Sequence, residues 1–293
     1  MWCTANPVRA SRQRKKTNVA ASRRVIVAIA QMASGPDKQQ NIRRAVDLVQ
    51  EAAANGATLV ALPETFDYRG DTSTISSIAE PLPGTALGPL MGLAAERGVW
   101  ILAGSVHEQD ADASMPYNTS VLIDPRGRIA AAYRKMHLFD ITIGDRSVAE
   151  SSHYTAGTEV VCAEAAGMKV GLTICYDIRF PELYRRLADF GADLVFIPSS
   201  FTAPTGEAHW EILVRARAIE NQCFVVAPGQ AGVGAGGIAT YGNSMIVDPW
   251  GRVLARAPQE GEHVISAELD LRELADVRKR LPALHNRKIP AFR

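Results

Sequence analysis

The sequence predicts an α/β protein whose sheet is covered by helices on both faces, and three observations support this prediction. Short runs of apolar and β-branched residues alternate with segments in which apolar residues recur at helical spacing. The predicted strands are apolar throughout instead of alternating, which is typical of strands buried on both faces. A hairpin motif occurs twice, at Asp124 and at Asp248. This repetition indicates that the chain has two comparable halves.

The first half alternates strands and helices. A β-branched run forms the first predicted strand, and the helix after it stops at Asn55-Gly56. A second strand runs into Pro63-Glu64, and Gly98 ends the second helix before a third strand. The predicted strands are 25–32, 57–62 and 99–106, and the predicted helices are 41–53 and 86–97.

Each half also contains a predicted β-hairpin. Asp-Pro-Arg-Gly separates strands 119–123 and 128–133, and Asp-Pro-Trp-Gly separates strands 244–247 and 252–255. Proline fixes φ inside such a turn, and glycine supplies the positive φ.

The second half repeats the alternation. A strand over 170–174 leads directly into Cys175, and another strand runs into Ser199-Ser200. A Gly-rich loop at 233–237 lacks the helix that a nucleotide-binding fingerprint requires, so we expect no nucleotide site there. The other predicted elements are helices 181–190, 209–221 and 271–280 and strands 192–197, 223–230 and 263–269.

Length and composition are those of a globular protein with a large core. The chain has 293 residues, of which 47% are hydrophobic and 22% charged. We expect one domain over residues 25–281 and a C-terminal tail, 282–293, that is disordered or crosses to a partner. Residues 1–24 hold seven basic residues and no acid, which leaves 25 basic against 31 acidic residues in the remainder. This mildly acidic body gives no indication of a nucleic-acid partner.

Two interpretations of the basic segment stay open. It is a disordered extension of a cytoplasmic protein, or a transit peptide for a mitochondrial or plastid matrix. No run of about 18 apolar residues occurs, so we expect no membrane span. Cys3, Cys162, Cys175 and Cys223 are widely spaced without a metal-binding pattern. This spacing argues against a metal site and favours a reducing compartment.

A carboxylate, an ammonium and a thiol each follow a predicted strand. They belong to Glu64, Lys135 and Cys175. Open α/β sheets carry their sites where strands end. Such a set can perform acyl chemistry, because the carboxylate accepts the thiol proton, the thiolate attacks a carbonyl, and the ammonium stabilises the oxyanion.

A structural or a redox role would also account for the cysteine. Taken alone, Cys175 is equally explained as a buried core cysteine. A redox-sensing thiol would need Cys162 or Cys223 close by as a resolving cysteine. No histidine can be paired with Cys175 from spacing alone, although His137, His153 and His209 are present.

Three segments resemble the signatures of the nitrilase, or carbon-nitrogen hydrolase, superfamily. They are LPE at 62–64, YRKMHL at 133–138 and GLTICYDIRFPE at 171–182, in the family's order. The resemblance implies a four-layer α-β-β-α sandwich and a Glu-Lys-Cys triad acting through a thioester, with no cofactor and no metal. It also implies a homodimer or higher homo-oligomer, built through a helical face for which 181–190 and 209–221 are candidates.

The resemblance assigns a role to each residue of the triad. Glu64 would be the base, Lys135 the oxyanion stabiliser and Cys175 the nucleophile, helped by the backbone N–H of Tyr176. A second glutamate of the family matches Glu150 best, although the intervening stretch is one residue short.

Further segments resemble the branch that contains deaminated glutathione amidase and omega-amidase. They are 135–140, 200–211, 215–222 and 241–251. The resemblance implies an amidase for a small carboxylate-bearing amide, most like the former. The alternatives are an omega-amidase, which Phe139 also fits, a nitrilase or N-carbamyl hydrolase, and a silent interaction protein on the same scaffold.

Several residues are candidates for substrate binding or for supporting the site. Arg179 is a candidate to bind the substrate's carboxylate, although an ion pair with Asp177 or Glu182 explains it equally. The remaining candidates are Tyr176, Ser199, Thr202, His209 and Tyr241.

Overall fold

The computed structural model describes residues 24–143, 146–234 and 237–289. The expectations for the basic N-terminal segment therefore lie outside the described residues, apart from Arg24. Within the described part, no helix is both long enough and apolar enough to cross a membrane.

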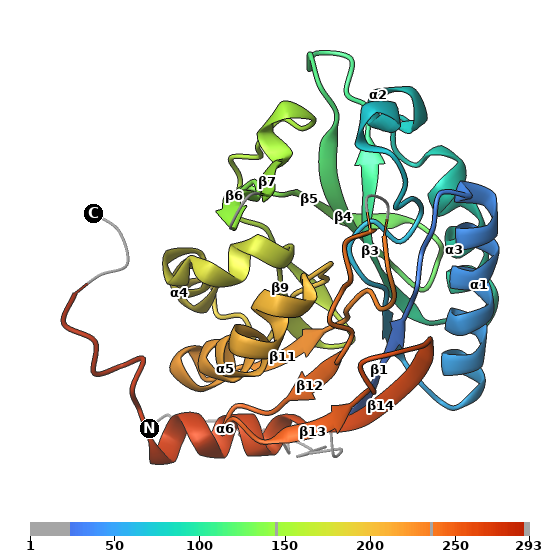
Figure 1. Cartoon of the computed structure of the whole chain (residues 1–293). Helices are drawn as coiled ribbons and strands as arrows, with labels where there is room; N and C mark the ends of the chain where they lie inside the picture. Colours follow the sequence, from blue (N-terminus) through green and yellow to red (C-terminus); the bar gives the residue numbers. More distant parts are fainter. Residues whose placement is uncertain (1–23, 144–145, 235–236, 290–293) are drawn as a thin grey trace, which may run out of the picture.

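Two six-stranded sheets form the centre of the molecule (Figure 1). In spatial order the first contains β14 (His263–Asp270), β1 (Arg24–Gln31), β2 (Leu59–Ala61), β3 (Trp100–Glu108), β4 (Tyr117–Ile123) and β5 (Ile129–Arg134). The second contains β13 (Val253–Arg256), β12 (Met245–Val247), β11 (Phe224–Ala227), β10 (Leu194–Phe196), β9 (Met168–Leu172) and β8 (Cys162–Ala165). A separate hairpin consists of β6 (Asp140–Ile143) and β7 (Arg146–Ala149).

The two sheets repeat one pattern of strand pairing, as the two hairpin motifs suggested. β1, β2 and β3 are parallel neighbours and β4 and β5 continue antiparallel, while β9, β10 and β11 are parallel and β12 and β13 continue antiparallel. In each hairpin the aspartate of the turn accepts two backbone N–H bonds at 2.8 to 3.0 Å, Asp124 in the first and Asp248 in the second. The aspartate therefore holds the turn that proline and glycine shape.

Helices cover the outer face of each sheet (Figure 1). α1 (Lys38–Ala54) and α3 (Gly84–Arg97) pack on the first sheet, and α4 (Pro181–Asp189) and α5 (Ala203–Asn221) on the second. The apolar side chains of α1 and α3 join one core cluster, and a second cluster spans both sheets and includes α4 and α5. This arrangement confirms the four-layer α-β-β-α sandwich.

α5 begins six residues earlier than its apolar spacing predicted. Its first turn contains Pro204 and Gly206, which show no helical periodicity. Proline is tolerated in a first turn because its missing N–H would lack a helical partner there. Gly206 donates its N–H to the carbonyl of Thr202 at 2.8 Å, and the ring of Tyr241 occupies the place where a Cβ would stand.

The C-terminal segment contacts the body of its own chain as far as Arg287. It follows α6 (Leu271–Arg280), the last helix. Gln222 donates to the carbonyl of Leu281 at 2.5 Å, and Arg287 forms an ion pair with Asp189 at the end of α4. The expectation that residues 282–293 are disordered or cross to a partner stays a prediction.

Candidate active site

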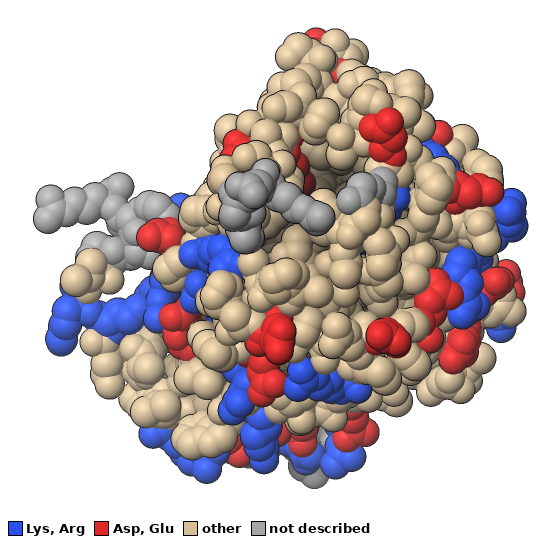
Figure 2. All heavy atoms as spheres, viewed as in Figure 1, with Lys and Arg blue, Asp and Glu red and all other residues tan. Residues whose placement is uncertain are grey.

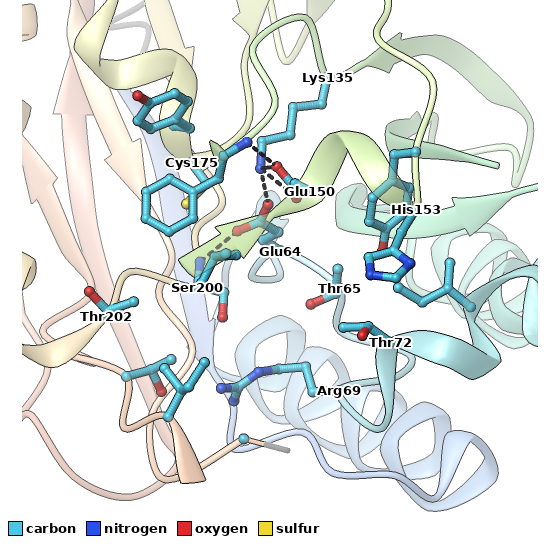
Figure 3. A pocket seen from close by; sticks show the side chains of 18 of the residues that line it. Glu64, Thr65, Arg69, Thr72, Lys135, Glu150, His153, Cys175, Ser200 and Thr202 are labelled. Atoms are coloured by element: carbon cyan, nitrogen blue, oxygen red, sulfur yellow. Dashed lines mark hydrogen bonds and ion pairs between the residues drawn. The ribbon is translucent and has the colours of Figure 1, made fainter. Parts of the chain in front are cut away.

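A cavity of about 730 Å³ lies where the segments following β2, β5 and β9 come together. Its volume is in the range of roughly 300–1,000 Å³ that is usual for small-molecule sites. Figure 2 shows that this face of the molecule is hollowed, with basic and acidic side chains interspersed below the hollow. Glu64, Lys135 and Cys175 all line the cavity, together with Glu150 (Figure 3).

Glu64 is a buried carboxylate whose two oxygens both have partners. Its side chain is 5% exposed. Oε1 accepts from Lys135 Nζ at 2.9 Å and from Asn118 Nδ2 at 3.0 Å, and Oε2 accepts from the backbone N–H of Ser200 at 2.8 Å. These donors fix the orientation of the carboxylate within the cavity.

Lys135 follows β5 directly and lies between two carboxylates. Its Nζ donates to Glu64 Oε1 at 2.9 Å and to Glu150 Oε1 and Oε2 at 2.9 and 2.7 Å. Burial by itself lowers the pKa of this ammonium, but the charges of Glu150 and Glu64 outweigh burial and hold the pKa well above its ordinary value. Lys135 is therefore a fixed cation at neutral pH.

Glu150 begins a short 3-10 turn directly after the β6–β7 hairpin, which the sequence did not predict. Besides contacting Lys135, its Oε2 accepts from the backbone N–H of Phe139 at 2.6 Å. The hairpin thus returns the chain so that a residue 15 positions after the lysine reaches its Nζ.

Cys175 opens a 3-10 turn, residues 175–179, three residues after β9 ends at Leu172. Its φ of +46° is in the left-handed region, which a non-glycine residue occupies only at a cost in energy. Its N–H donates to the carbonyl of Pro198 at 2.9 Å. Buried Asp177 holds the turn by accepting from the N–H of Ile174 at 2.8 Å and from the Tyr133 hydroxyl at 2.7 Å.

The thiol of Cys175 is protonated at neutral pH. Burial raises its pKa well above the ordinary value, and the adjacent charge of Glu64 raises it further. The charge of Lys135 and the backbone N–H of Ser200 act in the opposite direction but do not outweigh burial. A base must therefore take the proton before the sulfur can react, and Glu64 lines the same cavity, close enough for its charge to act on this thiol.

Tyr176 and Thr202 line the cavity, as predicted for binding residues, but four other candidates do not. Arg179 donates to His209 Nδ1 at 3.3 Å and lies over the ring of Phe201, so neither of its expected ion pairs forms. Ser199 is fully buried and donates its hydroxyl to the carbonyl of Ile197, while its neighbour Ser200 lines the cavity. Tyr241 packs against α5.

Sequence reasoning missed several lining residues on the segment after β2 and near the end of β3. Arg69 and Tyr68 belong to the loop that also carries Glu64, and His107 lies between the rings of Tyr68 and Tyr154 with both centroids 5.9 Å away. The only available signal was their nearness to a strand end. Among the described cysteines, Cys162 and Cys223 do not line the cavity, so no resolving thiol stands in it beside Cys175.

Comparison with known proteins places the chain among enzymes. The family model described as carbon-nitrogen hydrolase matches residues 26–279. Deaminated glutathione amidase of Mus musculus is 44% identical over 270 residues, which is 90% of this chain and 83% of that protein. Omega-amidase NIT2 of Xenopus tropicalis is 39% identical over 89% of this chain and 94% of that protein.

Solved structures give the same assignment. Saccharomyces cerevisiae Nit3, described as a member of branch 10 of the nitrilase superfamily, has a TM-score of 0.82 at 32% identity, covering 91% of this chain and 97% of that one. The C. elegans NitFhit protein has a TM-score of 0.85 at 38% identity, and the match covers 90% of this chain but only 65% of that longer chain. A mutant amidase from Nesterenkonia sp. AN1, which carries the acetamide moiety of fluoroacetamide covalently on its active-site cysteine, has a TM-score of 0.77 at 26% identity, covering 90% and 94%.

The three signature segments, the four-layer sandwich and the family match all agree. The chain belongs to the carbon-nitrogen hydrolase family and is a hydrolase of carbon–nitrogen bonds other than peptide bonds.

Proposed function

We propose that this protein is an amidase that hydrolyses a small carboxylate-bearing amide through a thioester on Cys175. The observation that carries the proposal is a single buried carboxylate, Glu64, that accepts a hydrogen bond from the ammonium of Lys135 and lines the same cavity as the thiol of Cys175, on which its charge acts. A base, a nucleophile and a fixed cation thus line one cavity.

In the acylation step the sulfur of Cys175 forms a bond to the amide carbon while Glu64 takes the thiol proton. Lys135 and the backbone N–H of Tyr176 stabilise the oxyanion of the tetrahedral intermediate. The carbon–nitrogen bond then breaks, and Glu64 returns the proton to the departing nitrogen. The products of this step are ammonia and a thioester.

In the second step water hydrolyses the thioester. Glu64 takes a proton from water as the oxygen attacks the thioester carbon, and the same donors stabilise the second oxyanion. When the carbon–sulfur bond breaks, Glu64 returns the proton to the sulfur, so the carboxylic acid leaves and Cys175 is again a thiol.

Glu150 positions Lys135 in this mechanism. Both of its oxygens accept from Nζ, which leaves Lys135 little freedom to move away from the oxyanion. Its charge also keeps the ammonium protonated. Because Lys135 remains charged throughout, Glu64 is the group that gains and loses protons.

The known relatives support both the chemistry and the substrate class. The Nesterenkonia amidase carries its covalent adduct on a cysteine, and the 44% identical mouse protein is a deaminated glutathione amidase. We therefore propose substrates most like deaminated glutathione. Omega-amidase activity is the first alternative, on the 39% identity to the Xenopus enzyme, and nitrile or N-carbamyl hydrolysis is the second.

Ammonia release across a substrate panel tests this proposal. The panel contains deaminated glutathione, 2-oxoglutaramate, a short aliphatic nitrile and an N-carbamyl amino acid. We expect the highest kcat/KM with deaminated glutathione and a lower value with 2-oxoglutaramate. The reverse order would favour the omega-amidase, and turnover of the nitrile or the N-carbamyl compound alone would overturn the amidase assignment.

We also propose that the protein forms a homodimer or higher homo-oligomer through the helical face formed by α4 and α5. The face carries exposed apolar side chains, with Ile212 of α5 69% exposed and Ile219 46% exposed, and Phe190 just after α4 38% exposed. Exposed apolar side chains on adjacent helices favour association with a second copy.

Replacing Ile212 with aspartate is expected to convert the oligomer to a monomer at micromolar concentration, because a buried, unpaired charge at an interface is strongly unfavourable. Light scattering coupled to size-exclusion chromatography measures the mass. Ile129→Asp, on an exposed position of β5 in the other sheet, is the matched control and should leave the mass unchanged. A monomeric wild-type protein would contradict the proposal.

A further inference from the structure

Arg69 is a cation that the cavity holds in addition to Lys135. It belongs to the loop after β2, five residues beyond Glu64 in the sequence. Figure 3 shows it on the side of the cavity opposite Lys135 and Glu150, with the guanidinium end inside the cavity. Among the described residues that line the cavity, Lys135 and Arg69 are the two that carry a full positive charge.

The two cations have different partners. Lys135 contacts two carboxylates. Arg69 has no ion pair with any carboxylate in the described part of the chain, and its Nη1 makes only two long hydrogen bonds, to Gln230 Oε1 at 3.4 Å and to the carbonyl of Ala231 at 3.3 Å. Asp71 also lines the cavity, but its Oδ1 accepts from the backbone N–H of Ser73 at 2.9 Å.

Burial of Arg69 is unfavourable in the absence of an anion. Burial lowers the pKa of this guanidinium to about 10, and the negative charge of Glu64 offsets the shift only in part. Arg69 therefore remains cationic at neutral pH, with most of its five N–H donors without a strong acceptor. An anionic ligand would supply the missing acceptors, and a planar guanidinium matches a carboxylate with two parallel hydrogen bonds.

Arg179 is the arginine that the sequence suggested for binding the substrate's carboxylate. Its position excludes it from this role. It lies outside the cavity, between the ring of Phe201 and His209. Gly234 of the neighbouring loop leaves room for Arg69, because a Cβ at that glycine would stand 2.7 Å from Arg69 Nη2. The backbone around the guanidinium is thus shaped to its side chain.

We propose that Arg69 is the specificity-determining residue that binds the substrate's carboxylate while the amide lies at Cys175. This inference rests on the proposed function, since it assumes that an amide is the reacting group. The carboxylate would pair with Arg69 on one side of the cavity, and the amide carbon would lie between Cys175 and Lys135 on the other. The cavity would then select a short-chain acid that carries its amide at the end opposite the carboxylate.

The test compares two substrates of equal length in two variants. The substrates are 4-carbamoylbutanoate, which carries a carboxylate, and pentanamide, which is uncharged. Arg69→Met removes the charge and keeps the apolar stem, whereas Arg69→Lys keeps the charge without the bidentate fork. Arg179→Met is the matched control because this arginine lies outside the cavity.

We expect Arg69→Met to raise KM for 4-carbamoylbutanoate roughly 10- to 100-fold, because the variant loses a charge-assisted hydrogen-bonded pair with the substrate. The effect on kcat should be smaller. The same variant should leave kcat/KM for pentanamide within about 2-fold of wild type, and Arg69→Lys should recover part of the lost affinity. Arg179→Met should change neither substrate's KM.

An equal loss on both substrates would show that Arg69 is structural, and an unchanged KM for the acid would show that its carboxylate binds elsewhere. Either result overturns this inference and leaves the proposed amidase standing. Failure of the proposed function looks different, because the wild-type protein would then release ammonia from neither substrate nor from deaminated glutathione.

Discussion

Replacing Cys175 with alanine is expected to lower kcat for amide hydrolysis by at least about 10⁴-fold, because no other described residue that lines the cavity has a thiol to form the thioester. The fold should persist, since the side chain is small and leaves little empty space behind it. Alanine tolerates the positive φ of this position no worse than cysteine does. Ammonia release measures the loss of activity, and thermal unfolding checks the fold.

Cys223→Ala is the matched control for this experiment. Cys223 is 1% exposed and its thiol lies 3.9 Å from the carbonyl of Arg217, away from the cavity. We expect full activity in this variant and a change in thermal stability similar to that of Cys175→Ala. Full activity in Cys175→Ala would refute the nucleophile assignment. A wild-type protein inactive on the whole panel would instead favour the interaction protein on the same scaffold.

The parts of the fold that the sequence predicted are those set by local pattern. Apolar runs identified the central strands of both sheets because they are buried on both faces. The β6–β7 hairpin and β8 were missed because their composition is mixed and their pairing is short. The first turn of α5 was missed for a related reason, because it is built from proline and glycine and held by contacts with Tyr241.

The candidate site also contains residues that the sequence could predict and residues that it could not. Glu64, Lys135 and Cys175 could be found because each lies within three residues of the end of a strand, and strand ends converge in this class of fold. Arg69 could not be found, because nothing in the local sequence of its loop indicates that its side chain points into the cavity. The direction of the Arg179 side chain could not be predicted for the same reason, since the turn that presents Cys175 directs it toward His209.

Asp177 shows most clearly what the sequence left undecided. The sequence offered it as an ion-pair partner of Arg179, whereas the structure buries it and gives it four hydrogen bonds that support the turn. Besides Ile174 and Tyr133, it accepts from the backbone N–H and from Nδ1 of His137, at 3.1 and 2.7 Å. The strained φ of Cys175 therefore depends on a carboxylate two residues further along the chain.

Replacing Glu64 with glutamine is expected to lower the rate of thioester formation by at least about 10³-fold, because an amide cannot accept the thiol proton. The substitution keeps the size of the side chain, and it removes a negative charge that raises the pKa of Cys175. The pKa of the thiol should therefore fall, since Lys135 still favours the thiolate. Alkylation of Cys175 by iodoacetamide should then reach half its maximal rate at a lower pH than in wild type.

In Glu64→Gln we thus expect slower thioester formation together with a lower pKa of the Cys175 thiol. This combination distinguishes a base from a group that only orders the site. A disordered site would lose thioester formation without any fall in the pKa of the thiol. Glu150→Gln is the matched control, because it removes the other carboxylate on Lys135 and leaves Glu64 in place. We expect a loss of about 10- to 100-fold in that variant, as for residues that orient a catalytic group. Single-turnover mass spectrometry measures the acyl-enzyme, and its formation at the wild-type rate in Glu64→Gln would show that another group takes the proton.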